Sequence, residues 1–189
     1  MNYKESSIIL EEIKKSERIL INCHRGPDSD SVGSALALQE ILQIMEKDVE
    51  VICPSDIPKD LIFLNEAKNI RRVNFTSFDF SGYDLFLILD SSNYSMVTGE
   101  KDSVKPGIKS IVIDHHFSND KFGDINLVDP DMTSTSELLY HIFSDWGNEI
   151  TRNVAESLLT GIMGDTGAFQ YQNVGQKTIR VAADLMDKG

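Results

Sequence analysis

The chain has few residues that could build a disulfide or zinc site, and no segment long enough to cross a membrane. Its two cysteines, Cys23 and Cys53, each lie in an expected buried strand beside branched apolar residues, which favours reduced core thiols. No apolar stretch approaches the roughly 18 residues that a membrane span needs, and the N-terminal segment lacks the features of a signal peptide. We therefore expect a cytoplasmic protein with no membrane partner.

A run of lysine and arginine is also missing. The 18 basic residues are outnumbered by 30 acidic ones, and the formal net charge is −12. This balance argues against a broad binding surface for long duplex nucleic acid or for an anionic membrane. A phosphate-bearing substrate would need local positive charge, which bound metal ions could supply.

The apolar pattern indicates a single α/β domain. Strands are expected where branched apolar residues cluster, at residues 18–24, 49–55, 84–92 and 109–116. Helices are expected at residues 8–17, 33–45, 58–69, 134–147 and 151–169, and a last helix begins near Gly175. Two of the strands are nearly continuous apolar runs, typical of parallel strands buried on both faces. We predict a mainly parallel sheet of about five strands with helices on both faces.

The first strand leads into a helix through the segment "HRGPDSDSVGS", residues 24–34. We expect Gly33 and Ser34 to let the backbone turn tightly and to open that helix. The positive end of the helix dipole would then favour an anion nearby.

Acidic residues and histidines follow the ends of three expected strands. The carboxyl ends of parallel strands form one edge of a sheet, so these side chains should meet there. Any one aspartate would be explained well enough as a helix cap. However, three of the four histidines stand beside an acid at a strand end, whereas chance placement would scatter them. The full set is His24, Asp28, Asp30, Asp90, Asp114, His115 and His116.

Such a mixed, acid-rich set suits divalent transition metals, with Mn²⁺ as the first candidate and Mg²⁺, Co²⁺ or Fe²⁺ as alternatives. Two metals need about six to eight ligand groups, including one carboxylate that bridges them, and the set is large enough. We therefore predict a centre that holds two metal ions.

Four segments also resemble a known family. The motifs "HRGPDSDSVGS", "LILDSS", "VIDHH" and "GIMGDTGAF" occur in the order and approximate spacing of the four motifs of the DHH phosphoesterases. The chain looks most similar to the branch of bacterial oligoribonucleases and 3′-phosphoadenosine 5′-phosphate phosphatases. The first and third motifs are specific signals, whereas a lone aspartate after a strand is a weak one.

This resemblance implies a role for each residue of the metal centre. Asp90 would bridge two manganese ions. Asp165, in "MGDTG" at the end of an expected helix, is assigned as a ligand by the resemblance alone. One ion would be held by His24, Asp28 and Asp90, and the other by Asp30, Asp90, His115 and Asp165.

Three further residues are expected to act on the substrate or on their neighbours. The resemblance implies that His116 approaches the substrate phosphate and assists the leaving group. It also implies that Asp114 orients a neighbouring histidine. Arg25 could contact a phosphate through its fork of donors, although a solvated turn arginine is the more common role at such a position.

Members of this family usually carry a second, C-terminal domain with a glycine-rich histidine motif that holds the nucleotide. We expect residues 1–189 to form a DHH catalytic domain truncated before such a substrate-binding domain. The resemblance implies hydrolysis, in which a hydroxide held between the two metal ions would attack phosphorus in line with the leaving oxygen. The expected substrates are short oligonucleotides, dinucleotides (cyclic ones included) or 3′-phosphoadenosine 5′-phosphate. A manganese-dependent inorganic pyrophosphatase and a non-catalytic nucleotide-binding module stay open as alternatives, and so does a homodimer.

Overall fold

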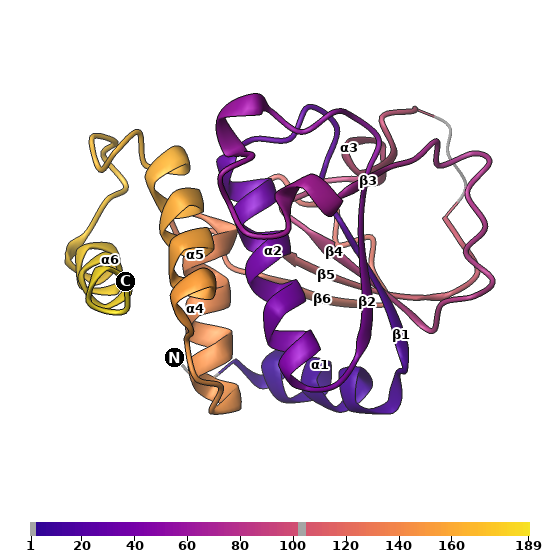
Figure 1. Cartoon of the computed structure of the whole chain (residues 1–189), viewed down its shortest axis with the longest axis horizontal. Helices are drawn as coiled ribbons and strands as arrows, with labels where there is room; N and C mark the ends of the chain where they lie inside the picture. The colour runs from indigo at the N-terminus through magenta and orange to yellow at the C-terminus, as the bar shows by residue number, and fades with distance from the viewer. Residues whose placement is uncertain (1–2, 102–104) are drawn as a thin grey trace.

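The computed structural model describes residues 3–101 and 105–189, and its centre is a six-stranded sheet (Figure 1). The strand order is β3-β2-β1-β4-β5-β6, and every neighbouring pair is parallel. The expected α/β class and parallel sheet are confirmed, with six strands, close to the number expected. The strands are β1 (Arg18–Asn22), β2 (Asp48–Cys53), β3 (Arg71–Arg72), β4 (Leu85–Leu89), β5 (Lys109–Asp114) and β6 (Ile125–Val128).

Three long helices, α2, α4 and α5, stand side by side between the sheet and α6 (Figure 1). Short 3-10 turns, η1 and η2, occupy part of the connection from β2 to β3. Within the described residues, no helix is long and apolar enough to span a membrane. The helical elements are α1 (Lys4–Lys15), α2 (Ser29–Ile44), η1 (Lys59–Leu61), η2 (Ala67–Asn69), α3 (Tyr94–Thr98), α4 (Thr135–Trp146), α5 (Arg152–Asp165) and α6 (Gln176–Asp187).

Alternate strand residues face two separate apolar clusters, one on each side of the sheet. Ile19 and Ile21 of β1 face the larger cluster, which contains residues of all the long helices, while Leu20 faces the smaller one. The smaller cluster is covered by α3 and by an aromatic segment, in which Phe80 lies 5.9 Å from the Phe86 ring. Helices therefore lie on both faces, as expected, but only a short one lies on the second face.

The expected helix at residues 58–69 is wrong. Leu61, Leu64 and Ala67 are buried at intervals of three residues, and consecutive members are joined by i to i+3 backbone hydrogen bonds of 3.2 Å. That period belongs to 3-10 turns and not to an α-helix. Glu66 also adopts a left-handed backbone conformation (φ 64°), which stops any helix there.

The start of α2 differs from the expectation as well, because the helix begins at Ser29 and not at Gly33. Asp28 caps it by accepting hydrogen bonds from the backbone N–H groups of Asp30 (3.1 Å) and Ser31 (3.0 Å). Gly33 lies inside the helix, where a Cβ atom would stand 2.4 Å from the carbonyl oxygen of Ser157 in α5. The glycine therefore permits a close approach of two helices and does not form a turn.

The same close contact continues toward the end of α5. A Cβ atom on Gly164 would lie 2.5 Å from the Cβ of Ser29, the first residue of α2. The two helices therefore run antiparallel, and the end of α5 lies beside the start of α2. This contact brings Asp165 to the carboxyl edge of the sheet.

Candidate metal centre

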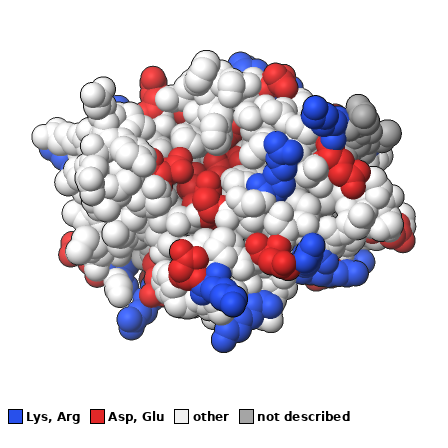
Figure 2. Space-filling model, turned by 90° about the horizontal axis from the view of Figure 1, so that it is seen from above, with Lys and Arg blue, Asp and Glu red and all other residues white. Residues whose placement is uncertain are grey.

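Charged side chains gather at the carboxyl edge of the sheet, near the point where the strand order reverses between β1 and β4. His24 follows β1, Asp90 directly follows β4, and Asp114 ends β5. This is the position at which open parallel sheets bind ligands. Figure 2 shows acidic side chains (red) gathered in a hollow near the middle of the surface seen from above, with basic side chains (blue) beside it.

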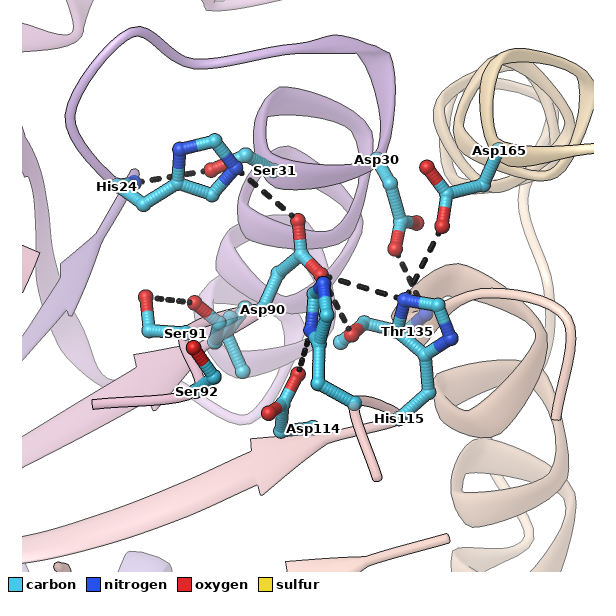
Figure 3. Close-up of polar contacts among 12 residues, drawn as sticks. His24, Asp30, Ser31, Asp90, Ser91, Ser92, Asp114, His115, Thr135 and Asp165 are labelled. Carbon is cyan, nitrogen blue, oxygen red and sulfur yellow. Dashed lines mark hydrogen bonds and ion pairs between the residues drawn. The ribbon is translucent and has the colours of Figure 1, made fainter. Parts of the chain in front are cut away.

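Asp90 stands at the centre of the cluster, between His24 on one side and His115 on the other (Figure 3). Its Oδ2 lies 3.3 Å from His24 Nε2, and its Oδ1 lies 3.7 Å from His115 Nε2. Thr135 Oγ1 donates a hydrogen bond to Oδ1 over 3.1 Å. Asp90 is 2% exposed and has a left-handed backbone (φ 50°), a strained conformation for a residue with a side chain.

His24 and Asp28 form a group with one oxygen of Asp90. His24 Nδ1 lies 2.9 Å from the carbonyl oxygen of Arg25, so Nδ1–H donates there and Nε2 faces the carboxylates. Asp28 uses Oδ1 to cap α2, while its Oδ2 lies 3.6 Å from His24 Nε2. Burial lowers the pKa of His24, but hydrogen bonds to Asp28 and Asp90 outweigh burial and raise it to about 10.

Asp30, His115 and Asp165 form a second group on the other side of Asp90. His115 Nε2 lies 3.0 Å from Asp165 Oδ2, yet this buried nitrogen makes no well-formed hydrogen bond with any described residue. Asp30 is fully buried and accepts hydrogen bonds from the backbone N–H groups of Thr135 (2.7 Å) and Ser136 (2.9 Å). Burial and the negative charges of Asp90 and Asp165 raise the pKa of Asp30. Burial lowers the pKa of His115, but Asp165, Asp30 and Asp90 outweigh burial and raise that pKa.

The donor sets suit a cation. Metal-binding histidines usually donate their second N–H to a carbonyl or carboxylate. His24 does so with Nδ1, and His115 Nδ1 lies 3.4 Å from the carbonyl oxygen of Met132. Bringing buried carboxylates this close together without a cation is costly, as the raised pKa of Asp30 indicates. Three sets of residues each place their ligand atoms within 4.8 Å of one another. These sets are His24, Asp28 and Asp90; Asp30, His115 and Asp165; and Asp90, His115 and His116.

His116 is held by Asp114 and is partly exposed to solvent. Its Nδ1 lies 2.8 Å from Asp114 Oδ1, and Asn119 Nδ2 donates to Asp114 Oδ2 over 2.6 Å. The bond to Asp114 raises the pKa of His116. Burial acts to raise the pKa of Asp114, but its bonds to His116 and Asn119 keep it below the usual range. The His116 side chain is 44% exposed, and Asp114 contacts its Nδ1, not its Nε2.

The structure brings all eight sequence-predicted aspartates and histidines together at one place, whereas Arg25 lines a neighbouring pocket. The sequence reasoning missed Thr135, which bonds to Asp90, and Asn119, which bonds to Asp114. Asp114 and Asn119 stand only five positions apart in "DHHFSND", but no spacing in the sequence places Thr135 beside Asp90.

The segment after Asp165 turns back sharply. Gly167, Ala168 and Phe169 all have left-handed backbones, with φ of 55°, 54° and 67°. Thr166 Oγ1 accepts a hydrogen bond from the N–H of Phe169 over 3.1 Å. This turn ends α5 directly after Asp165, which is the last residue of the helix and a candidate metal ligand.

Comparisons with known proteins agree with the geometry. A Thermus thermophilus protein named "Bifunctional oligoribonuclease and PAP phosphatase NrnA" is 31% identical over 99% of this chain and 55% of its own length. The Bacillus subtilis protein of the same name is 26% identical over 94% of this chain and 55% of its own length. The chain thus spans about half the length of these curated relatives.

A solved structure has the same fold. The crystal structure of an exopolyphosphatase-related protein from Bacteroides fragilis superposes with a TM-score of 0.89 at 28% identity, covering 98% of this chain and 56% of that one. Residues 18–162 match the N-terminal domain of the DHH family, as the four motifs led us to expect. The chain therefore belongs to the DHH family.

Proposed function

We propose that this chain is a phosphoesterase that hydrolyses short oligonucleotides, dinucleotides or 3′-phosphoadenosine 5′-phosphate at a centre of two divalent cations. Asp90 is the observation that carries the proposal: Oδ2 faces His24, and Oδ1 faces His115. A carboxylate with one oxygen toward each of two ligand groups is arranged to bridge two metals. The names of the two NrnA relatives support the class of substrate.

The ligands of the two ions would be the sets on either side of Asp90. Imidazole combined with carboxylate favours Mn²⁺ among the available divalent ions. When bound, such cations supply positive charge to the phosphate and lower the pKa of water. One ion would be held by His24, Asp28 and Asp90, and the other by Asp30, Asp90, His115 and Asp165.

The chain itself would assist the leaving group through His116. Asp114 occupies Nδ1 of this imidazole, so Nε2 is the nitrogen that faces a substrate. The same contact raises the pKa of His116 and favours its protonated form. A protonated Nε2 can hydrogen-bond the phosphate and pass its proton to the departing oxygen.

Hydrolysis assays with defined substrates test this proposal. The chain should cleave pApA, 3′-phosphoadenosine 5′-phosphate or cyclic di-AMP faster than pyrophosphate. The activity should disappear with EDTA and return with Mn²⁺. Faster cleavage of pyrophosphate would favour the inorganic pyrophosphatase, and a calorimetric titration without Mn²⁺ binding would favour a non-catalytic module.

A pair of variants tests the shared ligand. Asp90→Ala should lose both ions and the activity together. Asp60→Ala removes an exposed carboxylate in η1 and should keep both, which makes it the matched control. Retained activity of Asp90→Ala in added Mn²⁺ would contradict the shared-ligand arrangement.

A further inference from the structure

An open polar pocket of about 830 Å³ lies beside the metal centre, on the same edge of the sheet. It is formed where β1, β2 and β3 end, together with the end of α3. A volume of this size is within the usual range for small-molecule sites, about 300–1,000 Å³. Its lining includes Arg25, Gly26, Ser55, Arg72, Asn74 and Gly99.

The pocket is joined to the metal centre through the loop that follows β1. Arg25 directly follows His24, whose Nε2 lies 3.3 Å from Asp90. The N–H of Arg25 donates to the carbonyl oxygen of Met96 (2.8 Å), and the N–H of Gly26 donates to Ser55 Oγ (3.0 Å). These bonds hold one wall of the pocket at a fixed position relative to a candidate metal ligand.

The pocket also concentrates positive charge on a strongly acidic protein. Arg25 is exposed and forms no ion pair with any residue that the structure describes. Arg72 binds both oxygens of Asp56 through Nη1 alone, at 2.9 Å each, so Nη2 and Nε have no partner among the described residues. Two guanidinium groups with unused N–H donors can bind phosphate oxygens in a fork. Glu100 also lines the pocket, so its lining carries two positive charges and one negative charge.

We propose that this pocket binds the nucleotide next to the scissile phosphate, with its own phosphate held by Arg25 and Arg72. The inference rests on the proposed function and extends it, because it makes a second phosphate the feature that the domain recognises. A substrate with several linked nucleotides would lie along the edge of the sheet, from the metal centre into the pocket. The site thus selects short single strands over esters with one phosphate.

Steady-state kinetics with two substrates test the proposal. Bis(p-nitrophenyl) phosphate carries one phosphate and cannot reach the pocket, whereas pApApA can. In Arg25→Gln and Arg72→Gln, the ratio of kcat/KM for pApApA to that for bis(p-nitrophenyl) phosphate should fall about tenfold, mainly through KM, since each variant removes a charge-assisted phosphate contact. The KM for pApApA should also become less sensitive to salt.

Arg71→Gln is the matched control. Arg71 is the exposed neighbour of Arg72, it pairs with Glu50, and it does not line this pocket. Its ratio should change less than twofold. A parallel loss for both substrates in the Arg25 and Arg72 variants, or an equal change in Arg71→Gln, would overturn the proposal.

A binding measurement separates this inference from the proposed function. Fluorescence anisotropy of labelled pApApA needs no turnover and can be recorded in EDTA. The unmodified chain could fail to hydrolyse either substrate. In that case, weaker binding of pApApA by Arg25→Gln and Arg72→Gln than by Arg71→Gln would still support the pocket. Equal binding by all three variants would refute it.

Discussion

Replacing Asp114 by asparagine tests how the structure prepares His116. Asp114 is fully buried, and its two oxygens accept hydrogen bonds from His116 Nδ1 (2.8 Å) and Asn119 Nδ2 (2.6 Å). Asparagine has nearly the same shape, but it places a donating NH2 group where Asp114 has its second accepting oxygen, so one of the two donors loses its acceptor. The substitution also removes the negative charge that raises the pKa of His116, and that pKa should therefore fall.

The size of the effect follows from the exposure of the ring. A hydrogen bond to a charged group contributes about 1.5–3 kcal/mol. Because the His116 side chain is 44% exposed, solvent screening reduces this contribution to about 1–2 kcal/mol. A loss of that size corresponds to an approximately 5–30-fold lower kcat in Asp114→Asn.

The sign of the pH dependence can also be worked out. A raised pKa in the folded protein keeps His116 protonated to higher pH than in the unfolded chain. The stability that this contact adds is therefore present at low pH and is lost as pH rises through the folded-state pKa. In Asp114→Asn, the fall in kcat on the alkaline side should begin at lower pH.

Two measurements check these expectations. Mn²⁺-activated cleavage of pApA from pH 5.5 to 9 gives the rate profile, and NMR titration of the imidazole in metal-free protein gives the direction of the His116 pKa change. Asp124→Asn is a control, since the Asp124 carboxylate also accepts two hydrogen bonds, from the N–H (2.8 Å) and Oγ (3.0 Å) of Ser110, but lies outside the metal centre. An unchanged kcat with an unmoved alkaline limb would refute the role assigned to Asp114.

Three other predictions follow from the structure. Mn²⁺ binding at pH 7 should release protons, because the pKa values of His24, His115 and Asp30 are all raised and a metal needs neutral imidazole and ionised carboxylate. Calorimetry in two buffers of different ionisation enthalpy counts these protons; apparent affinity should rise with pH, and binding without proton release would contradict the ligand assignment. Gly33→Ala should lower the free energy of unfolding by about 1–2 kcal/mol in urea denaturation and weaken Mn²⁺ binding, because the new Cβ would lie 2.4 Å from the Ser157 carbonyl oxygen. An unchanged denaturation midpoint would show that the two helices separate freely. Ala168→Gly should raise the free energy of unfolding by up to about 1 kcal/mol, since glycine adopts the left-handed backbone without strain. A clear loss of stability would show that the backbone of Ala168 is not strained.

Much of the site could be predicted because it depends on a general property of parallel sheets. Residues that follow β1, β4 and β5 must lie at one edge, so His24, Asp90 and His115 could be grouped before any coordinates were known. Asp30 was predicted as part of the cluster, but its bond to the N–H of Thr135 joins residues 105 positions apart. Such a contact depends on how α2 and α4 pack together, and the local sequence pattern does not predict that packing.

The errors have equally specific causes. Residues 58–69 carry apolar side chains at a spacing of three, which is close enough to the α-helical period of 3.6 to be mistaken for it. The usual role of glycine in turns predicts a turn at Gly33, whereas a close contact between two buried helices decides its role here. The covering of the second face by Phe80 and its aromatic neighbours was missed because that segment has no regular period.

The candidate ligands are spread along the chain from His24 to Asp165. An unfolded polypeptide cannot bring them together, so an ion bound there would select the native state and slow its loss. Under the proposed function, the supply of the bound cation would then govern how long each molecule survives proteolysis.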